Sequence, residues 1–199
     1  MRTAYITAGV ILAGAVAWYL AEETNAVEAV ATTLDDWTGG FMKLSDMAKV
    51  TAAHVANRNV RAFLAVIRRG EGTADAGGYT RLFGGEQFTS LADHPRRLVS
   101  KSGYKSTAAG AYQFLESTWD ETRRVMGLTD FSQASQDRGA VGRIAFRGAL
   151  ADVLAGRFED AVRKCAKEWA SLPFSPYGQP TISLATAQTV YTNGGGVMA

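Results

Sequence analysis

The chain has 199 residues, of which 47% are apolar and 20% charged, and its formal net charge is +2. A chain this rich in apolar residues and this low in net charge is not intrinsically disordered, and it has enough apolar residues to bury a hydrophobic core. A single cysteine, Cys165, excludes an intrachain disulfide framework, and His54 and His94 lack metal-ligand spacing, so we expect no metal and no cofactor.

The first predicted element is an N-terminal hydrophobic helix within residues 1–21. Residues 3–21 carry no charge, and this 19-residue segment is about as long as a tilted helix that crosses a bilayer. Arg2 before it predicts a cytoplasmic N-terminus. Ten of these 19 residues are Ala, Gly or Thr, which predicts a weak anchor. A permanent anchor, a signal peptide cleaved after Ala15-Val16-Ala17 and a helix buried in a larger assembly remain alternatives.

Residues 22–56 are predicted to form a helical connector. Five acidic residues and no basic ones lie between residues 22 and 36, and a Trp37-Thr38-Gly39-Gly40 break follows. Apolar residues then recur at helical spacing, which indicates a packing helix: Phe41, Leu44, Met47 and Val50.

Residues 57–199 are predicted to form one domain, mainly α with a small β element. The first helix carries Val60, Phe63, Leu64 and Ile67 at positions i, i+3, i+4 and i+7. Gly77 to Leu98 has the paired glycines of turns and hairpins, and is the expected place of β structure. Three further helices are predicted from apolar spacing: one with Tyr112, Leu115, Trp119 and Met126, closed by Gly127; one with Phe158, Ala161, Val162, Cys165 and Trp169, closed before Pro173; and one with Leu184, Ala187, Gln188 and Tyr191.

The candidate catalytic residue is Glu71. It follows Gly70 at the end of the first predicted helix, where the helix dipole disfavours a negative charge. With an apolar core beside it, the pKa of this carboxyl should be raised, which suits a general acid. The alternative interpretation is that Glu71 faces solvent or pairs with Arg68 or Arg69.

Short segments spread over residues 57–196 carry a resemblance to a known family, in the same order along the chain. They are Arg61-Ala62-Phe63-Leu64, Glu71-Gly72-Thr73, Gly84-Gly85-Glu86, Phe88-Thr89, Asp93-His94-Pro95-Arg96, Leu98-Val99, Lys105-Ser106-Thr107 with Gly110, Tyr112 and Gln113, Gly127-Leu128, Asp130-Phe131-Ser132, Ser135-Gln136-Asp137, Arg147-Gly148-Ala149-Leu150, Trp169-Ala170-Ser171-Leu172-Pro173 and Tyr177-Gly178-Gln179. On these segments the chain resembles the phage lambda endolysin family of lysozyme-like lytic transglycosylases.

The resemblance implies a lysozyme-like α+β fold, mainly α, with a small β-hairpin lobe. It implies cleavage of the β-1,4 bond between N-acetylmuramic acid and N-acetylglucosamine in peptidoglycan, with a 1,6-anhydro product and Glu71 as the essential acid. The substrate-binding residues that it implies are Tyr79, Ser106, Thr107, Gly110, Tyr112, Gln113, Tyr177, Gln179 and Asn193. Tyr112 also fits the buried face of its predicted helix, so a core role is an equal alternative.

A two-carboxylate muramidase is the alternative mechanism, since hydrolysis needs a second acid beside the bond. The candidates are Asp75 and Glu86, and we expect Glu86 to have a structural or substrate-contacting role. The family has an acidic residue after its Gly-Tyr pair, whereas here Thr80 follows Gly78-Tyr79. This departure leaves a single-acid mechanism intact.

The expected biology is host-cell lysis by a monomer that acts on peptidoglycan and binds no nucleic acid. Residues 3–21 resemble signal-arrest-release segments, which implies a protein held in the host periplasm at the inner membrane and then released. A virion-associated lysin that acts during DNA entry is the first alternative. A catalytically silent wall-binding module on the same scaffold is the second.

Overall fold

A computed structural model describes residues 43–101 and 103–199. The predicted hydrophobic helix, residues 1–21, lies outside them, as does most of the connector. In the described ranges, no helix combines the length and the apolar character needed to cross a membrane. Besides a helical stretch at residues 43–48 and a short 3-10 helix at Gly78–Thr80, the helices are α2 (Ala52–Ala56), α3 (Arg58–Gly70), α4 (Glu116–Met126), α5 (Gln133–Phe146), α6 (Leu150–Ala155), α7 (Phe158–Cys165) and α8 (Leu184–Asn193). The strands are β1 (Val99–Lys101) and β2 (Tyr104–Ser106).

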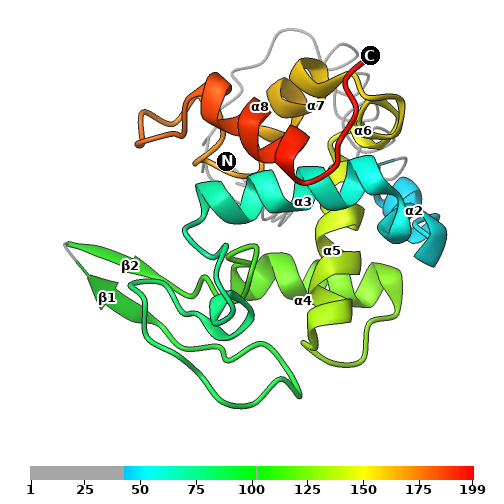
Figure 1. The fold of residues 1–199 in the computed structure, drawn as a ribbon. Coiled ribbons are helices and arrows are strands. Elements are labelled where there is room, and N and C mark those ends of the chain that lie inside the picture. Colours follow the sequence, from blue (N-terminus) through cyan, green and yellow to red (C-terminus); the bar gives the residue numbers. More distant parts are fainter. Residues whose placement is uncertain (1–42, 102) are drawn as a thin grey trace, which may run out of the picture.

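Helix α3 lies across the middle of the molecule, as Figure 1 shows, with α6, α7 and α8 on one side and α4, α5 and the β1–β2 hairpin on the other. The side chain of Asn57 caps its first turn by accepting hydrogen bonds from the backbone of Asn59 and Val60. The predicted apolar face, from Val60 to Ile67, is buried in the core. The first predicted helix is therefore confirmed.

Helix α5 was not predicted, because its second half is buried on all sides. Every residue from Gly139 to Phe146 is buried, so polar and apolar positions do not alternate at helical spacing. Gly142 lies against α4, and a Cβ atom there would collide with the sulfur of Met126. The glycines of α5 allow close packing of α4, which a sequence pattern does not reveal.

Two of the predicted helices begin or end at different residues in the structure. Helix α4 begins at Glu116, so Tyr112 and Leu115 precede it; its predicted end is confirmed at Gly127, which has a φ of 64°. Helix α7 ends at Cys165, and Trp169 follows in a series of turns. Both predictions were wrong for the same reason: buried residues of a turn next to a helix continue its apolar spacing.

The β structure is small, as predicted, but its strands lie after the segment in which they were predicted. Strands β1 and β2 pair as an antiparallel hairpin after Leu98, with Val99 opposite Ser106. Within Gly77 to Leu98 only a single bridge joins Arg81 and Gln87. The reason is that Phe83 and Arg81 hydrogen-bond to the backbone of Ala108 and Gly110, so this segment pairs with a distant loop.

The packing helix expected in the connector is present where the structure describes it. Residues 43–48 are helical, and Met47 and Val50 are buried in the main core. This end of the connector is therefore packed onto the domain.

Candidate active site

Glu71 lies immediately after the last residue of α3, and its backbone N–H still donates to the carbonyl of Ile67 (2.9 Å). Its Oε1 accepts a hydrogen bond of 2.6 Å from the hydroxyl of Ser171. Burial of the carboxyl raises the pKa of Glu71, and the Ser171 hydrogen bond opposes that rise. The result is a carboxylic acid that keeps its proton to higher pH than usual, as a general acid requires.

The two arginines that precede Glu71 do not neutralise it. Arg68 donates instead to the backbone carbonyls of Thr73 and Asp75 at 2.9 Å. Arg69 is exposed. The interpretation of Glu71 as half of an ion pair with Arg68 is therefore wrong.

Thr73 joins the turn that carries Glu71 to Ala111, and Gln136 fixes Ala111 from the other side; neither was predicted as a site residue. The buried hydroxyl of Thr73 donates to the carbonyl of Ala111 at 2.5 Å. The side-chain amide of Gln136 accepts from Ala111 N–H at 2.8 Å and donates to the carbonyls of Tyr79 and Phe131. The Thr73 bond brings the Glu71 turn beside the segment from Gly110 to Gln113.

Gly110 and Gln113 form a tight turn in which both residues have positive φ, 79° and 47°. The amide of Gln113 donates to the carbonyls of Gly110 (2.9 Å) and Arg81 (3.2 Å). The N–H of Gly110 donates to the same Arg81 carbonyl. The side chain of Gln113 thus stabilises the turn from Gly110 to Gln113 and joins it to Arg81.

Tyr79 and Tyr112 are brought together by one carboxylate. Their hydroxyls donate to Oδ1 of Asp137 at 2.8 and 2.6 Å. The guanidinium of Arg68 lies 4.6 Å from the centre of the Tyr79 ring. Tyr112 is 2% exposed and sits in the core, whereas Tyr79 is half-buried at its edge.

The other predicted substrate-binding residues lie on three separate segments. Ser106 and Thr107 end the hairpin, and the Thr107 hydroxyl accepts from the first N–H of α4 (3.1 Å). Tyr177 and Gln179 are exposed in the loop before α8, where the Tyr177 hydroxyl donates to the carbonyl of Lys167. Asn193 is exposed at the end of α8. None of these residues has a hydrogen bond to Glu71 among the contacts of the described residues.

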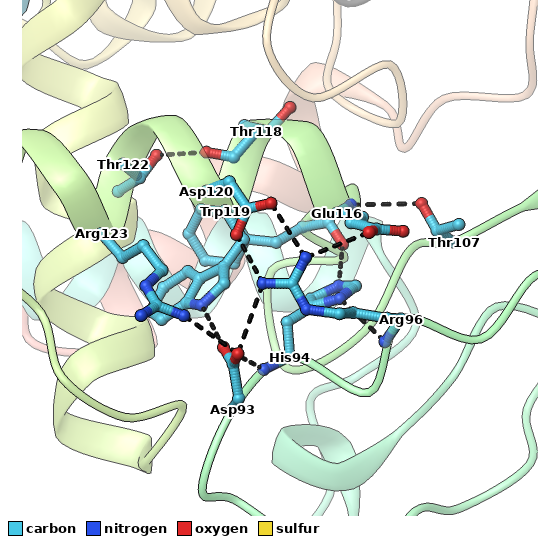
Figure 2. A network of polar contacts seen from close by, with 11 residues as sticks. Asp93, His94, Arg96, Thr107, Glu116, Thr118, Trp119, Asp120, Thr122 and Arg123 are labelled. Carbon is cyan, nitrogen blue, oxygen red and sulfur yellow. Dashed lines mark hydrogen bonds and ion pairs between the residues drawn. The ribbon is translucent and has the colours of Figure 1, made fainter.

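A network of charged side chains ties the segment before the hairpin to α4 (Figure 2). Asp93 accepts from Trp119 Nε1 (3.3 Å) and from Arg123 (2.9 Å), and Arg96 forms ion pairs with Asp120 and Glu116. Together with the Thr107 cap, this network holds both ends of the hairpin to α4.

His94 lies at the centre of the same segment, as a hydrogen-bonded residue of its loop. Its Nε2 is 2.9 Å from the carbonyl of Phe114, and its Nδ1 is 3.2 Å from the N–H of Arg96. A carbonyl only accepts and an amide N–H only donates, so the ring is neutral with its proton on Nε2. Burial lowers the pKa of His94, which favours the same neutral form.

The two candidates for a second catalytic carboxylate are engaged elsewhere. Asp75 forms a two-pronged ion pair with Arg81 (2.7 and 2.9 Å), which lowers its pKa. Glu86 pairs with exposed Arg97 at 3.0 Å. Among the described residues, no group of three or more His, Cys, Asp or Glu side chains has the arrangement of a metal site.

Two surface hollows, of about 290 and 400 Å³, lie away from Glu71. The first is beside the start of α7 and the C-terminal residues, and the second lies between residues 44–48 and α4. Glu71 lines neither of them.

Comparison with known proteins gives consistent matches. The family model described as Endolysin matches residues 61–198. The endolysin of Escherichia phage P2 is 41% identical over 159 residues, which cover 72% of this chain and 96% of the relative. The endolysin of Escherichia phage lambda is 43% identical over 130 residues, which cover 62% of this chain and 82% of the relative. The structure of bacteriophage lambda lysozyme complexed with a chitohexasaccharide matches with a TM-score of 0.68 and 38% identity, over 72% of this chain and 97% of that chain. A second lambda lysozyme structure matches with a TM-score of 0.64 and 37% identity, over the same shares of the two chains.

Proposed function

The chain belongs to the phage lambda endolysin family. We propose that it cleaves the glycan strands of peptidoglycan with Glu71 as its acid. The observation that carries the proposal is the partly buried carboxyl of Glu71 at the end of α3, which is hydrogen-bonded to Ser171 and whose pKa is raised by desolvation. The chitohexasaccharide bound to the related lambda lysozyme supports a substrate of linked amino sugars.

We propose lytic transglycosylation as the reaction. Glu71 donates its proton to the glycosidic oxygen as the bond between that oxygen and the muramic acid C1 breaks. The 6-hydroxyl of the same muramic acid then attacks C1 and returns its proton to Glu71, which leaves a 1,6-anhydro end and consumes no water. One carboxyl group therefore acts first as acid and then as base.

The ion pairs of Asp75 and Glu86 support this reaction over hydrolysis. A hydrolase needs a second carboxylate that activates water or attacks C1. Asp75 is bound at both oxygens by Arg81, and Glu86 pairs with Arg97. A two-carboxylate muramidase is the alternative, and it requires one of these groups to leave its partner.

Mass spectrometry of the fragments released from purified peptidoglycan tests the reaction. We expect anhydro ends from the wild-type protein and from Glu86→Gln, and no fragments from Glu71→Gln. Reducing ends would show hydrolysis. A folded wild-type protein that binds peptidoglycan without releasing fragments would support a catalytically silent module.

We also propose that residues 3–21 tether the protein on the periplasmic side of the host inner membrane until the segment is released. The support is the sequence alone: 19 uncharged residues, rich in Ala and Gly, between Arg2 and two glutamates. Membrane fractionation before and after collapse of the membrane potential tests this proposal. Full-length protein should move from the membrane to the soluble fraction.

Three other results would contradict the tether. A mature protein that begins near residue 18 would indicate signal-peptide cleavage, and a full-length protein that stays in the membrane would indicate a permanent anchor. Detection of the chain in purified virions would support a virion-associated lysin.

A further inference from the structure

We propose that Ser171 is a positioning residue that determines which oxygen of Glu71 exchanges the proton, with Gly70 leaving the space that its hydroxyl needs. The inference rests on the proposed function and deepens it. Ser171 and Glu71 are 100 residues apart in the chain, yet their side chains meet at 2.6 Å. Among the described residues, Ser171 provides the one side-chain hydrogen bond to Glu71.

The backbone around Ser171 is fixed by packing on both sides. Its carbonyl accepts from Ile182 N–H at 2.9 Å. The preceding Trp169 donates through Nε1 to the carbonyl of Tyr112 (3.2 Å), and the following Leu172 is fully buried. Ser171 is therefore held between the core and Ile182, at the far end of the loop that leads to α8.

Gly70 makes the contact between Ser171 and Glu71 sterically possible. A Cβ atom built on Gly70 would lie 2.5 Å from the Ser171 hydroxyl oxygen, which is closer than real Cβ atoms approach. The serine hydroxyl would have to rotate away to accommodate it. Gly70 therefore leaves the space in which the Ser171 hydroxyl reaches the carboxyl of Glu71.

The hydrogen bond distinguishes the two oxygens of Glu71. When Glu71 is ionised, it can only accept, so the hydroxyl of Ser171 donates to Oε1. Oε2 is then the oxygen that gives the proton to the leaving group and takes it back from the 6-hydroxyl. Because Oε1 stays bonded to Ser171, the same oxygen serves in both steps without rotation of the carboxyl group.

The hydrogen bond also stabilises the ionised form against the effect of burial. Desolvation raises the pKa of Glu71 and the bond from Ser171 lowers it. Removing the hydroxyl should raise the pKa further, by about one pH unit, which is the usual effect of one hydrogen bond to a charged group. A poorly oriented and weaker acid should also react about ten-fold or more slowly.

The test is an NMR titration of the Glu71 carboxyl carbon, combined with the pH profile of fragment release, in wild type and Ser171→Ala. We expect a higher pKa, an alkaline limb moved to higher pH, and a plateau rate about ten-fold lower. Ser117→Ala, an exposed serine on α4, is the matched control and should titrate as wild type. A merely structural serine would lower the rate at every pH without moving the limb.

Gly70→Ala is the second variant, and it keeps the serine while displacing its hydroxyl. It should move the Glu71 titration in the same direction as Ser171→Ala, and it decides the question if Ser171→Ala does not fold. The inference is overturned if Glu71 titrates as in wild type in the folded variant.

The two proposals fail in different ways. A wild-type protein that releases no fragments contradicts the proposed function, whereas the NMR titration still tests the contact between Ser171 and Glu71. An active wild type with an unchanged Ser171→Ala titration and pH profile contradicts only the role of Ser171.

Discussion

Substitution of Asp93 tests how the segment before the hairpin is held to α4. The Oδ1 atom of Asp93 accepts from the N–H of His94 and from Nε1 of Trp119, a side chain with no exposed surface. Its Oδ2 atom accepts from Arg123 and Arg96. Asp93→Ala removes all four contacts, whereas Asp93→Asn keeps the acceptor for Trp119 and loses the charge.

The contacts predict different costs for the two variants. A buried Trp119 N–H without an acceptor costs about 1–3 kcal/mol. The two ion pairs join side chains that are each about 36–41% exposed, so each contributes only about 0.2–1 kcal/mol. We therefore expect Asp93→Ala to lose about 2–4 kcal/mol of unfolding free energy and Asp93→Asn about 1 kcal/mol.

Urea unfolding of the three proteins at neutral pH measures these losses. Burial raises the pKa of Asp93, but hydrogen bonds from the His94 backbone and Arg96 outweigh it, and the net pKa is lowered. The ionised form thus stabilises the fold at neutral pH, and this contribution is lost as the pH falls through the folded-state pKa. Equal losses in Asp93→Ala and Asp93→Asn would refute the reasoning that the Trp119 acceptor dominates.

Three further predictions concern the acid and the packing of α5. Glu71→Gln should abolish fragment release yet raise the unfolding free energy at neutral pH, because the raised pKa of Glu71 makes its ionised form unfavourable in the folded protein. Urea unfolding at several pH values should show that this gain disappears as the pH falls below the unfolded-state pKa of Glu71. Gly142→Ala should have a net cost of up to about 2 kcal/mol, because overpacking against the Met126 side chain exceeds the gain of about 1 kcal/mol in helix propensity, and calorimetry should show a lower Tm. Arg143→Met should cost about 3 kcal/mol by leaving Glu168 with fewer partners in the interior, and adding Glu168→Leu should recover much of the loss in urea unfolding.

The sequence predicted those elements whose signals lie within the element itself, such as apolar spacing and helix ends. Helix α3 has one apolar face and a polar one, so its spacing was clear, and Glu71 was recognisable as an acid at an unfavourable helix end. Helix α5 lacks such a contrast because its second half, from Gly139 to Phe146, is buried on every side. The hairpin was misplaced because residues 81–83 pair with a loop about 27 residues further along the chain.

The contacts that shape the site were beyond prediction from spacing. Ser171 reaches Glu71 across 100 residues, and Thr73 and Gln136 act through backbone groups of Ala111. The resemblance identified the segments that contain all three residues, but not the bonds between them. Those bonds depend on how α3, α5 and the loop before α8 pack together.

The central claim is that a single acid, Glu71, cleaves the glycan without water. Digestion of peptidoglycan in water labelled with a heavy oxygen isotope, followed by mass spectrometry, tests it most directly. We expect the new glycan ends to carry no label and to have the mass of the anhydro form. Labelled reducing ends would show that water attacks C1, so that Glu71 does not act alone and a second carboxylate is required.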